Sequence, residues 1–398
     1  MSMANALLIL SLMFAGCAKD EPTHAESKPE ASQPTAPTPA TKAPPTAATP
    51  APKAPTPPVT TTTPKAEPKT GSVACSNPNP FSFDWSLYLS WSTVGAQDLL
   101  KRINGKAGKL GPLEQKYCID LTTREAAYEK TLEAYGASAT DGLTVTNMDV
   151  LALAQSRPAV AILPSSHSNG ADGVLGPKSI ANMAGLAGRD VHVLVASVSE
   201  YADVRCAQIQ GVDPNSYNRK EMMPDKIALA LAGNDAKVNV GVLWNPELEQ
   251  TKRERPDLHV ICDSSSFPDE IIDMFVVAQD ALDRPGGDRF AALLAELFYD
   301  FNTQLKSGET RPWKALSKNF LDLPVDTVKH LATKTQMYTT PAEGVATYDR
   351  AHLEPIMATV VKTWTDRGHV TGPVSITYGD TNTKSHLRFT TKYMKAVK

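Results

Sequence analysis

Hydroxyl and carboxyl side chains occur together at four positions where the chain is expected to start a helix. Each position has Ser or Thr three residues before Asp or Glu, the capping-box spacing that pairs both side chains with backbone N–H groups. The four pairs are Thr146 and Asp149, Ser197 and Glu200, Ser266 and Asp269, and Thr340 and Glu343. Free N–H groups and the positive dipole end at a helix start can bind an anion or a polar ligand group. The simpler interpretation is that each pair only begins its helix.

Signatures of metal-dependent or nucleophilic catalysis are absent from the sequence. It contains no Gly-x-Ser-x-Gly, His-Glu-x-x-His, phosphate loop or Cys-x-x-Cys, and its eight histidines are scattered. We therefore expect no catalytic residues, no metal site and no cofactor, so that a binding protein is favoured over an enzyme. The formal net charge of −3 gives no reason to expect nucleic acid as a partner.

The elements that would position these residues alternate between strands and helices. Short apolar runs predict strands at 86–91, 117–121, 142–146, 159–163, 191–195, 238–244 and 259–262. Helices are expected between them at 95–103, 122–135 (with Thr122 and Glu125 as its capping box), 201–210 and 224–232, and later at 289–303, 325–334 and 341–365. This rhythm predicts an α/β fold with parallel-rich sheets flanked by helices and a helical C-terminal part. Such sheets bind ligands at the carboxyl ends of their strands.

The first 17 residues have the pattern of an export signal. An apolar run at 6–14 is too short to span a bilayer as a helix, and the small residues Ala15 and Gly16 follow it. Cys17, directly after them, resembles the lipid-attachment cysteine of bacterial lipoproteins, which takes up diacylglycerol and becomes the first residue of the mature protein. We therefore expect a lipidated, membrane-anchored protein in the periplasm or on the cell surface. The alternative is an ordinary secretory signal with an incidental cysteine.

Residues 18–72 have the composition of a disordered tether. They hold 14 of the chain's 31 prolines, together with Thr, Ala and Lys, and almost no large apolar side chains. Such a segment buries too little apolar surface to offset its chain entropy. Repeated Ala-Pro and Thr-Pro steps favour extended polyproline conformations, so that about fifty residues reach up to about 150 Å. A glycosylated stalk or a cell-wall spacer is the alternative interpretation.

Six segments further along the chain have an order and spacing typical of one family. They are 133–136, 141–149, 162–173, 180–188, 242–246 and 266–274, and they include Ser-Asn-Gly-Ala-Asp at 168–172 and Trp-Asn-Pro at 244–246. Over about 86–346 they resemble the solute-binding proteins of nitrate/taurine/sulfonate-type ABC importers, a family that also includes binders of thiamine precursors. The resemblance implies a two-lobe periplasmic-binding-protein-like fold of type II that closes on a small molecule.

The same resemblance implies a division of the chain into lobes. One lobe would comprise 76–170 and 267–398 and the other 171–266, with crossings near 170–173 and 264–267. The implied function is an extracytoplasmic solute-binding lipoprotein, expected to be a monomer, that delivers a small polar molecule to an ABC permease and its ATPase subunits. The alternatives are a ligand-binding sensor or surface lipoprotein without a transport role and, less favoured, an enzyme on the same fold.

Carried over by position, the resemblance implies ligand contacts at strand ends and helix starts. The implied set is Trp91, Ser92, Thr93, Asn147, Ser166, Ser168, Ser197, Ser199, Trp244 and Asn245. Hydroxyl and amide groups can bind a polar ligand without a fixed counter-charge, and tryptophan offers a flat apolar wall. The set contains no cationic side chain of the kind that binders of oxyanions and sulfonates place in their clefts. The alternative is that the tryptophans are core residues and that Ser197 and Asn147 only stabilise local structure.

Four cysteines follow Cys17, namely Cys75, Cys118, Cys206 and Cys262. In an exported domain they can form disulfides, and four cysteines allow three pairings that the sequence does not decide. We expect Cys75 to pair with Cys118 and Cys206 with Cys262, since each pair then falls within one implied lobe. Buried free thiols are the alternative.

Overall fold

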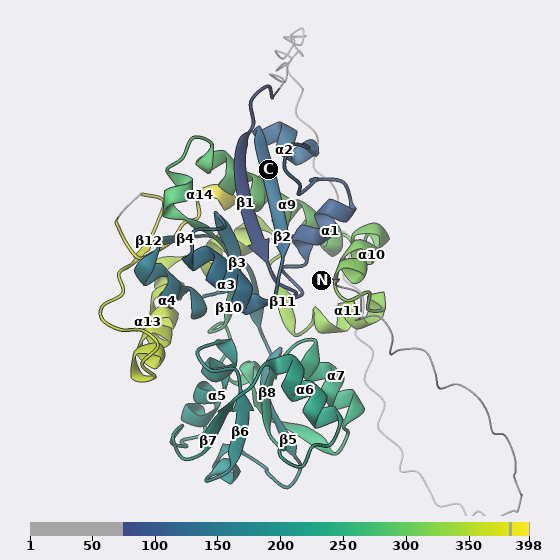
Figure 1. The fold of residues 1–398 in the computed structure, drawn as a ribbon, viewed down its shortest axis with the longest axis vertical. Coiled ribbons are helices and arrows are strands. Elements are labelled where there is room, and N and C mark those ends of the chain that lie inside the picture. The colour runs from purple at the N-terminus through teal and green to yellow at the C-terminus, as the bar shows by residue number, and fades with distance from the viewer. Residues whose placement is uncertain (1–74, 382–383, 398) are drawn as a thin grey trace, which may run out of the picture. The chain divides into compact units, whose positions relative to one another are not determined.

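Two β-sheets organise the part of the chain that the computed structural model describes, residues 75–381 and 384–397 (Figure 1). The strand order is β12-β13-β4-β10-β3-β1-β2 in the first sheet, with β11 against β4, and β7-β6-β8-β5-β9 in the second. The expected signal, Cys17 and the tether lie outside the described residues. Within those residues, no helix combines the length and apolar character needed to cross a membrane.

The strands of the first sheet come from two separate stretches of the chain. They are β1 (Asn79–Trp85), β2 (Ile119–Glu125), β3 (Gly142–Thr146), β4 (Ala159–Ser168), β10 (Ile272–Ala278), β11 (Thr335–Met337), β12 (Ile376–Tyr378) and β13 (Leu387–Phe389). The second sheet consists of β5 (Asp172–Pro177), β6 (Asp190–Val193), β7 (Asn218–Glu221), β8 (Gly241–Trp244) and β9 (Leu258–Asp263). The chain therefore leaves the first sheet after β4 and returns to it at β10.

Helices connect the strands along the whole described chain (Figure 1). Before the first crossing they are α1 (Thr93–Leu99), α2 (Pro112–Tyr117), α3 (Tyr128–Gly136) and α4 (Asp149–Ser156). Between the strands of the second sheet lie α5 (Val198–Ile209), α6 (Pro224–Ala232) and α7 (Glu247–Glu254), with 3-10 turns at Met183–Leu186 and Ser264–Ser266. After the return follow α8 (Gln279–Leu282), α9 (Gly287–Lys306), α10 (Thr310–Asn319), α11 (Val325–Leu331), α12 (Pro341–Thr347), α13 (Arg350–Asp366) and α14 (Lys392–Ala396).

Both sheets are mixed, because the chain crosses between them twice. β10 returns antiparallel to its neighbours β4 and β3, and β11 also runs antiparallel to β4. In the second sheet β5 is antiparallel to β8 and β9. The pairs of β1 with β2 and β3, of β13 with β4 and β12, and of β6 with β7 and β8 are parallel. The expected α/β class is thus present, with antiparallel pairs where the crossing strands and β11 join the sheets.

The first strand lies earlier in the chain than the sequence analysis predicted. β1 comprises Asn79–Trp85, whereas residues 86–91 form turns that lead into α1. Phe81, Phe83 and Trp85 alternate along β1 and are each at most 3% exposed. The stretch 86–91 is apolar because it is buried as a turn at the end of the strand, and a short buried turn and a short buried strand have the same composition.

Two expected capping boxes do not start helices. Thr122 and Glu125 lie within β2, which pairs with β1 along its whole length, so the following helix starts only at Tyr128. Ser266 ends a 3-10 turn, and Asp269 has a φ of 64°, so no α-helix begins there. Pairing within a sheet therefore outweighs the local helix signal at the first of these sites.

The C-terminal part is mainly helical, and it also completes the first sheet. Thr340 and Glu343 form the predicted capping box at the start of α12. The single helix expected at 341–365 is divided, because Asp349 starts α13 by accepting a hydrogen bond from the N–H of Ala351 at 3.0 Å. The short strands β12 and β13 were not predicted, and β13 pairs with β4.

Stacked aromatic rings join α9 to the centre of the first sheet. Phe81 of β1 stacks on Phe290 of α9 with the ring centroids 4.6 Å apart. Phe83 stacks on Phe275 of β10 at 5.1 Å, and Phe275 contacts Phe298 of α9 at 5.4 Å. All five rings are at most 3% exposed, and burying each stabilises the fold by about 1.5–3 kcal/mol. This packing fixes β1 and β10.

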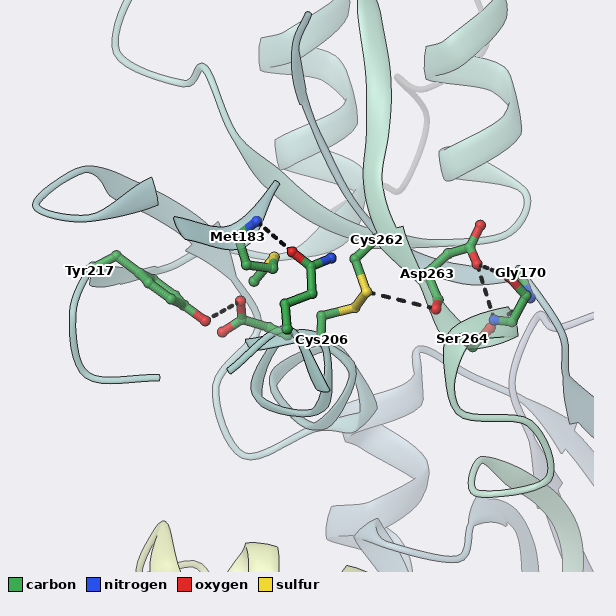
Figure 2. Close-up of a disulfide and its surroundings, with 10 residues drawn as sticks. Gly170, Met183, Cys206, Tyr217, Cys262, Asp263 and Ser264 are labelled. Atoms are coloured by element: carbon green, nitrogen blue, oxygen red, sulfur yellow. Dashed lines mark hydrogen bonds between the residues drawn. A yellow bond between two sulfur atoms is a disulfide. The ribbon is translucent and has the colours of Figure 1, made fainter. Parts of the chain in front are cut away.

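Two neighbouring segments carry the chain between the sheets. One leads from Ser168 at the end of β4 to β5, and the other from Asp263 at the end of β9 to β10. The hydroxyl of Ser264 joins them, since it lies 2.7 Å from the Ser168 hydroxyl. It also accepts a hydrogen bond from the Gly170 N–H at 2.7 Å (Figure 2). Gly170 has a φ of 86°, a left-handed conformation that favours glycine.

Two disulfides are present among the described residues. Cys206 of α5 is bonded to Cys262 of β9, beside the second crossing segment (Figure 2). Cys75 is bonded to Cys118, the residue before β2. These are the two pairings expected from the sequence. The bonded cysteines are 56 and 43 residues apart. In the chain-entropy account, a disulfide that closes a loop of this length lowers the entropy of the unfolded chain and so stabilises the folded protein by about 4 kcal/mol.

Replacing Cys206 and Cys262 together by alanine should lower the free energy of unfolding by about 2–5 kcal/mol, because the unfolded chain regains conformational freedom. Urea unfolding followed by far-ultraviolet circular dichroism measures the change. Dithiothreitol should destabilise the wild type more than the double variant, which has one disulfide fewer to lose. An unchanged unfolding midpoint in the double variant would contradict the prediction.

Candidate functional site

A cavity of about 290 Å³ is lined by residues of both sheets and their connecting loops. The first sheet contributes the turn after β1, the loop between β2 and α3, and residues at the start of β10. The second contributes the start of β5, the starts of α5 and α6, and the end of β8 with the start of α7. β1, β2 and β3 are parallel, so their carboxyl ends meet at one edge of the sheet and their connections converge there.

Four aromatic side chains line the cavity, namely Tyr88, Trp91, Tyr128 and Trp244. The ring of Trp91 lies 5.0 Å from that of Tyr88 and 5.5 Å from that of Tyr128, and it is nearly parallel to the latter. Trp244 contacts Tyr128 edge-on at 6.2 Å, so an aromatic ring of the second sheet joins those of the first. The indole N–H of Trp91 is buried without a hydrogen-bond partner among the described residues. Such a group can donate to an oxygen atom of a ligand.

Two buried carboxylates enter the cavity lining from the strands next to the crossings. Asp172 is the first residue of β5 and Asp273 the second of β10, and they are 3% and 2% exposed. The Ser166 hydroxyl donates to Oδ2 of Asp273 at 2.5 Å. Burial raises the pKa of Asp172 to about 7, and the charge of Asp149 contributes to this rise. Burial raises the pKa of Asp273 well above its usual range, and the charge of Asp172 raises it further.

A third buried carboxylate, Asp149, links the start of α4 to the start of α5. Its Oδ2 accepts hydrogen bonds from the Tyr128 hydroxyl at 2.8 Å and from the Val198 N–H at 3.4 Å. The hydroxyl of Thr146 accepts from the Asp149 N–H at 3.2 Å, which is one half of the predicted capping box. The other half is absent, because the Thr146 N–H donates to the Tyr128 hydroxyl at 3.3 Å and Met148 precedes the helix. Burial raises the pKa of Asp149 to about 6, although the hydrogen bonds from Tyr128 and Thr146 oppose the rise.

The first two N–H groups of α5, those of Val198 and Ser199, are bonded to side chains of the protein. Ser197 accepts a hydrogen bond from the Ser199 N–H at 3.2 Å. Glu200 accepts from the Ala196 N–H at 2.8 Å and contacts Nε2 of His369 at 2.7 Å. Burial alone would raise the pKa of Glu200, but the hydrogen bonds from His369 and Ala196 hold it at about 2. The sequence analysis considered this helix start as a possible ligand site. In the structure its Glu200 instead connects α5 to His369, in the segment after α13.

Acidic side chains make up the charged part of the cavity lining. They are Glu125, Glu129, Asp172, Asp225, Glu247 and Asp273. Oε2 atoms of Glu129 and Glu247 are buried without a hydrogen-bond partner, and burial raises the pKa of Glu247. No lysine, arginine or histidine occurs among the described residues that line the cavity. Three or more His, Cys, Asp or Glu side chains placed to hold a metal ion are not found in the described part of the chain.

Of the ten residues implied by the family resemblance, Trp91 and Trp244 line the cavity. The other eight are buried and do not line it, namely Ser92, Thr93, Asn147, Ser166, Ser168, Ser197, Ser199 and Asn245. Polar side-chain atoms of Ser92, Ser199 and Asn245 have no partner among the described residues. Ser166 instead positions Asp273 through its hydroxyl.

Asn147 holds the second crossing segment against the first sheet. Its Nδ2 donates to the Glu270 carbonyl at 3.0 Å, and its Oδ1 accepts from the Ile272 N–H at 3.0 Å. Thr93 likewise uses its hydroxyl within the protein, donating to the Ser90 carbonyl at 2.8 Å. In this structure the polar groups of both side chains are engaged by backbone atoms.

The sequence analysis missed Tyr88, Tyr128, Asp172 and Asp273. Tyr88 lies in the stretch wrongly predicted as a strand, and Tyr128 in a helix predicted to start six residues too early. Asp172 and Asp273 fall within the segments that resemble the family but were not selected. The sequence contains a signal for Asp273, because this residue interrupts the apolar run of β10. A carboxylate in a buried strand is costly, so its presence there indicates a functional or structural role.

No protein-family model matches the chain, and a search of curated proteins finds no match. Among solved structures, the alkanesulfonate-binding protein SsuA from Xanthomonas axonopodis pv. citri, bound to MOPS, is 14% identical with a TM-score of 0.59, over 75% of this chain and 96% of that chain. The periplasmic aliphatic sulphonate binding protein SsuA from Escherichia coli is 14% identical with a TM-score of 0.57, over 74% and 95%. A ligand binding component of an ABC-type import system from Staphylococcus aureus, with zinc bound, is 11% identical with a TM-score of 0.55, over 74% and 97%.

At these identities the likeness concerns the fold. The chain has the two-lobe periplasmic-binding-protein-like fold of type II, and the fold class expected from the sequence is confirmed. Its structural neighbours are sulfonate-binding proteins and components of ABC-type importers, the group that the sequence resembles.

Replacing Asp172 by asparagine should make the free energy of unfolding less dependent on pH. The folded protein keeps a proton on Asp172 up to about pH 7, whereas the unfolded chain releases it near about pH 4. The stability of the wild type should therefore fall relative to the variant as pH rises through this window, by a few kcal/mol. Urea unfolding at about pH 4.5 and about pH 7.5 measures the difference.

The matched control for this measurement is Asp225→Asn, which removes an exposed carboxylate from the same cavity lining. Its stability should follow the wild-type pH profile. An equal pH response in the two variants would show that burial of Asp172 is not the cause.

Proposed function

We propose that this protein is an extracytoplasmic solute-binding protein that captures a small polar molecule between two lobes and delivers it to an ABC transporter. The proposed lobes are residues 76–170 with 267–398, and residues 171–266. The observation that carries the proposal is the cavity, since its lining comes from both sheets and lies beside the two crossing segments. The structural neighbours, a periplasmic sulphonate binding protein and a ligand binding component of an ABC-type import system, support the same class of function.

Closure of the lobes and ligand binding would be linked through this lining. Asp172 and Trp244 belong to one proposed lobe, and Trp91 and Asp273 to the other. A ligand that contacts both pairs binds a closed arrangement more tightly than an open one, and it shifts the population toward closure by that difference in affinity. We place the hinge at the crossing segments, where Gly170 has a left-handed conformation.

Attachment to a membrane is the second part of the proposal. Lipid on Cys17 would anchor the chain, and a spacer of about fifty residues would let the domain reach up to about 150 Å from that anchor. This reach would allow the domain to search for solute and still dock on the permease. We propose a monomer at the periplasmic or outer surface of the membrane.

Solute binding should change the intrinsic fluorescence of the protein, because Trp91 and Trp244 line the cavity. The purified protein is screened against a broad panel of small metabolites by tryptophan fluorescence and small-angle X-ray scattering. A bound solute should shift the emission and reduce the radius of gyration. Trp244→Phe should lose much of the emission change.

The matched control is Trp313→Phe, since Trp313 does not line the cavity and its indole N–H donates to the Leu305 carbonyl at 3.2 Å. This variant should keep the response. No change in emission or in scattering across the whole panel would contradict the proposed function.

Lipid attachment is tested separately in cells that express the full chain with radioactive palmitate. The wild type should incorporate label and Cys17→Ser should not, because the thiol is the proposed acceptor. Ala18→Ser is the matched control and should incorporate label normally. Equal incorporation in Cys17→Ser would remove the anchor from the proposal without affecting the solute-binding part.

A further inference from the structure

We infer that the cavity binds an organic cation, a compact amine or ammonium compound, in preference to a sulfonate or another anion. The inference rests on the proposed solute-binding function and names its class of ligand. It is carried by three features that occur together in one cavity of about 290 Å³: aromatic rings, buried carboxylates, and the lack of any basic side chain among the described lining residues.

The carboxyl side chains of the lining face no basic side chain among the described lining residues. Asp172 and Asp273 are almost fully buried, and the hydrogen-bond donors that act on them are the hydroxyls of Ser168 and Ser166, which carry no charge. Bringing an anion next to a carboxylate of this lining that is ionised adds like-charge repulsion to the cost of removing the anion from water. A cation in the same place supplies the counter-charge that the protein itself does not provide.

The aromatic rings suit a cation as well. Trp91 and Tyr128 lie nearly parallel at 5.5 Å, and Trp244 meets Tyr128 at an interplanar angle of 76°. All three rings line the cavity, and a cation over the face of an aromatic ring is attracted by the ring's quadrupole. A cation–π contact is stronger where water is excluded, as it is beside a buried ring.

Unpartnered polar atoms in the lining point to a ligand independently of the charge. Trp91 is 4% exposed, and its indole N–H has no partner among the described residues. One carboxylate oxygen each of Glu129 and Glu247 is also buried without a partner. The N–H groups of a protonated amine would donate to carboxylate oxygens of this kind, and an oxygen atom on the same ligand would accept from Trp91.

Cation binding should release protons. The charges of Asp149 and Asp263 raise the pKa of Asp172, and those of Asp172 and Asp149 raise the pKa of Asp273. The charges of Asp273 and Asp172 also raise the pKa of Tyr88. The charge of His369 lowers the pKa of Asp149. Because burial raises the pKa of Asp172 to about 7, part of this group is protonated at neutral pH before binding. A fixed positive charge nearby lowers that pKa, so affinity should rise as pH rises through about 7.

The test compares probes of matched shape by isothermal titration calorimetry with the full chain. Choline is paired with its neutral isostere 3,3-dimethyl-1-butanol, benzylamine with benzyl alcohol, and ethanesulfonate serves as the anion. At least one cation should bind at least about tenfold more tightly than its neutral partner and than ethanesulfonate. The affinity for choline, whose charge does not depend on pH, should fall at least about threefold from about pH 8 to about pH 5.5.

Variants locate the effect in the cavity. Asp172→Asn and Asp273→Asn should each weaken cation binding by at least about tenfold, with little effect on the neutral partner. Asp257→Asn is the matched control, since Asp257 is exposed, pairs with Arg255 and does not line the cavity. Circular dichroism shows whether the Asp172 and Asp273 variants fold. If either does not, the inference is tested on the wild type, by the comparison of each cation with its neutral isostere and by the pH dependence of choline binding.

The outcomes separate the two proposals. Equal binding of a cation and its neutral isostere, or tighter binding of ethanesulfonate, overturns the cation inference and leaves the solute-binding function in place. Binding of none of the probes also overturns the cation inference, and the solute-binding function then stands or falls with the metabolite panel.

Discussion

The double crossing of the chain between two sheets is the constraint on which the rest of this structure depends. β4 leaves the first sheet and β10 returns beside it, while β5 and β9 do the same in the second sheet, so each sheet acquires antiparallel pairs. The hydroxyl of Ser264 ties the two crossing segments together. The strands that begin after these crossings, β5 and β10, carry Asp172 and Asp273 into one cavity, which no single sheet could build.

The cavity keeps groups that a purely structural interior would avoid. Burial raises the pKa of the carboxyl groups of Asp149, Asp172 and Asp273. The negative charge of Asp149 raises the pKa of the other two further. Groups of this kind destabilise the free protein, so their presence in a cavity is better explained by a ligand than by packing. The aromatic packing of α9 on β1 and β10 supplies stability elsewhere in the same sheet.

Fold and ligand class are separate properties of this chain. Its structural neighbours include two sulfonate-binding proteins at 14% identity, which share the arrangement of lobes. The ligand, however, is selected by the side chains that line the cavity, and these can change while the backbone arrangement is kept. Here the lining combines four aromatic rings with six acidic side chains. That composition favours a positively charged ligand, whereas the two sulfonate-binding neighbours are named for an anion.

The sequence by itself determined the α/β class and those elements whose signals are local. β3 and α6 have the predicted bounds 142–146 and 224–232, and the capping box at Thr340 starts α12, because turn residues, apolar periodicity and caps act over a few neighbouring residues. Trp91 and Trp244, selected through the family resemblance, line the cavity. Only the tertiary structure decided that 86–91 is a turn and that Asp172 and Asp273 share a cavity. The physical reason is that a buried turn and a buried strand have similar compositions, and that the proximity of two charges depends on where the chain crosses between the sheets.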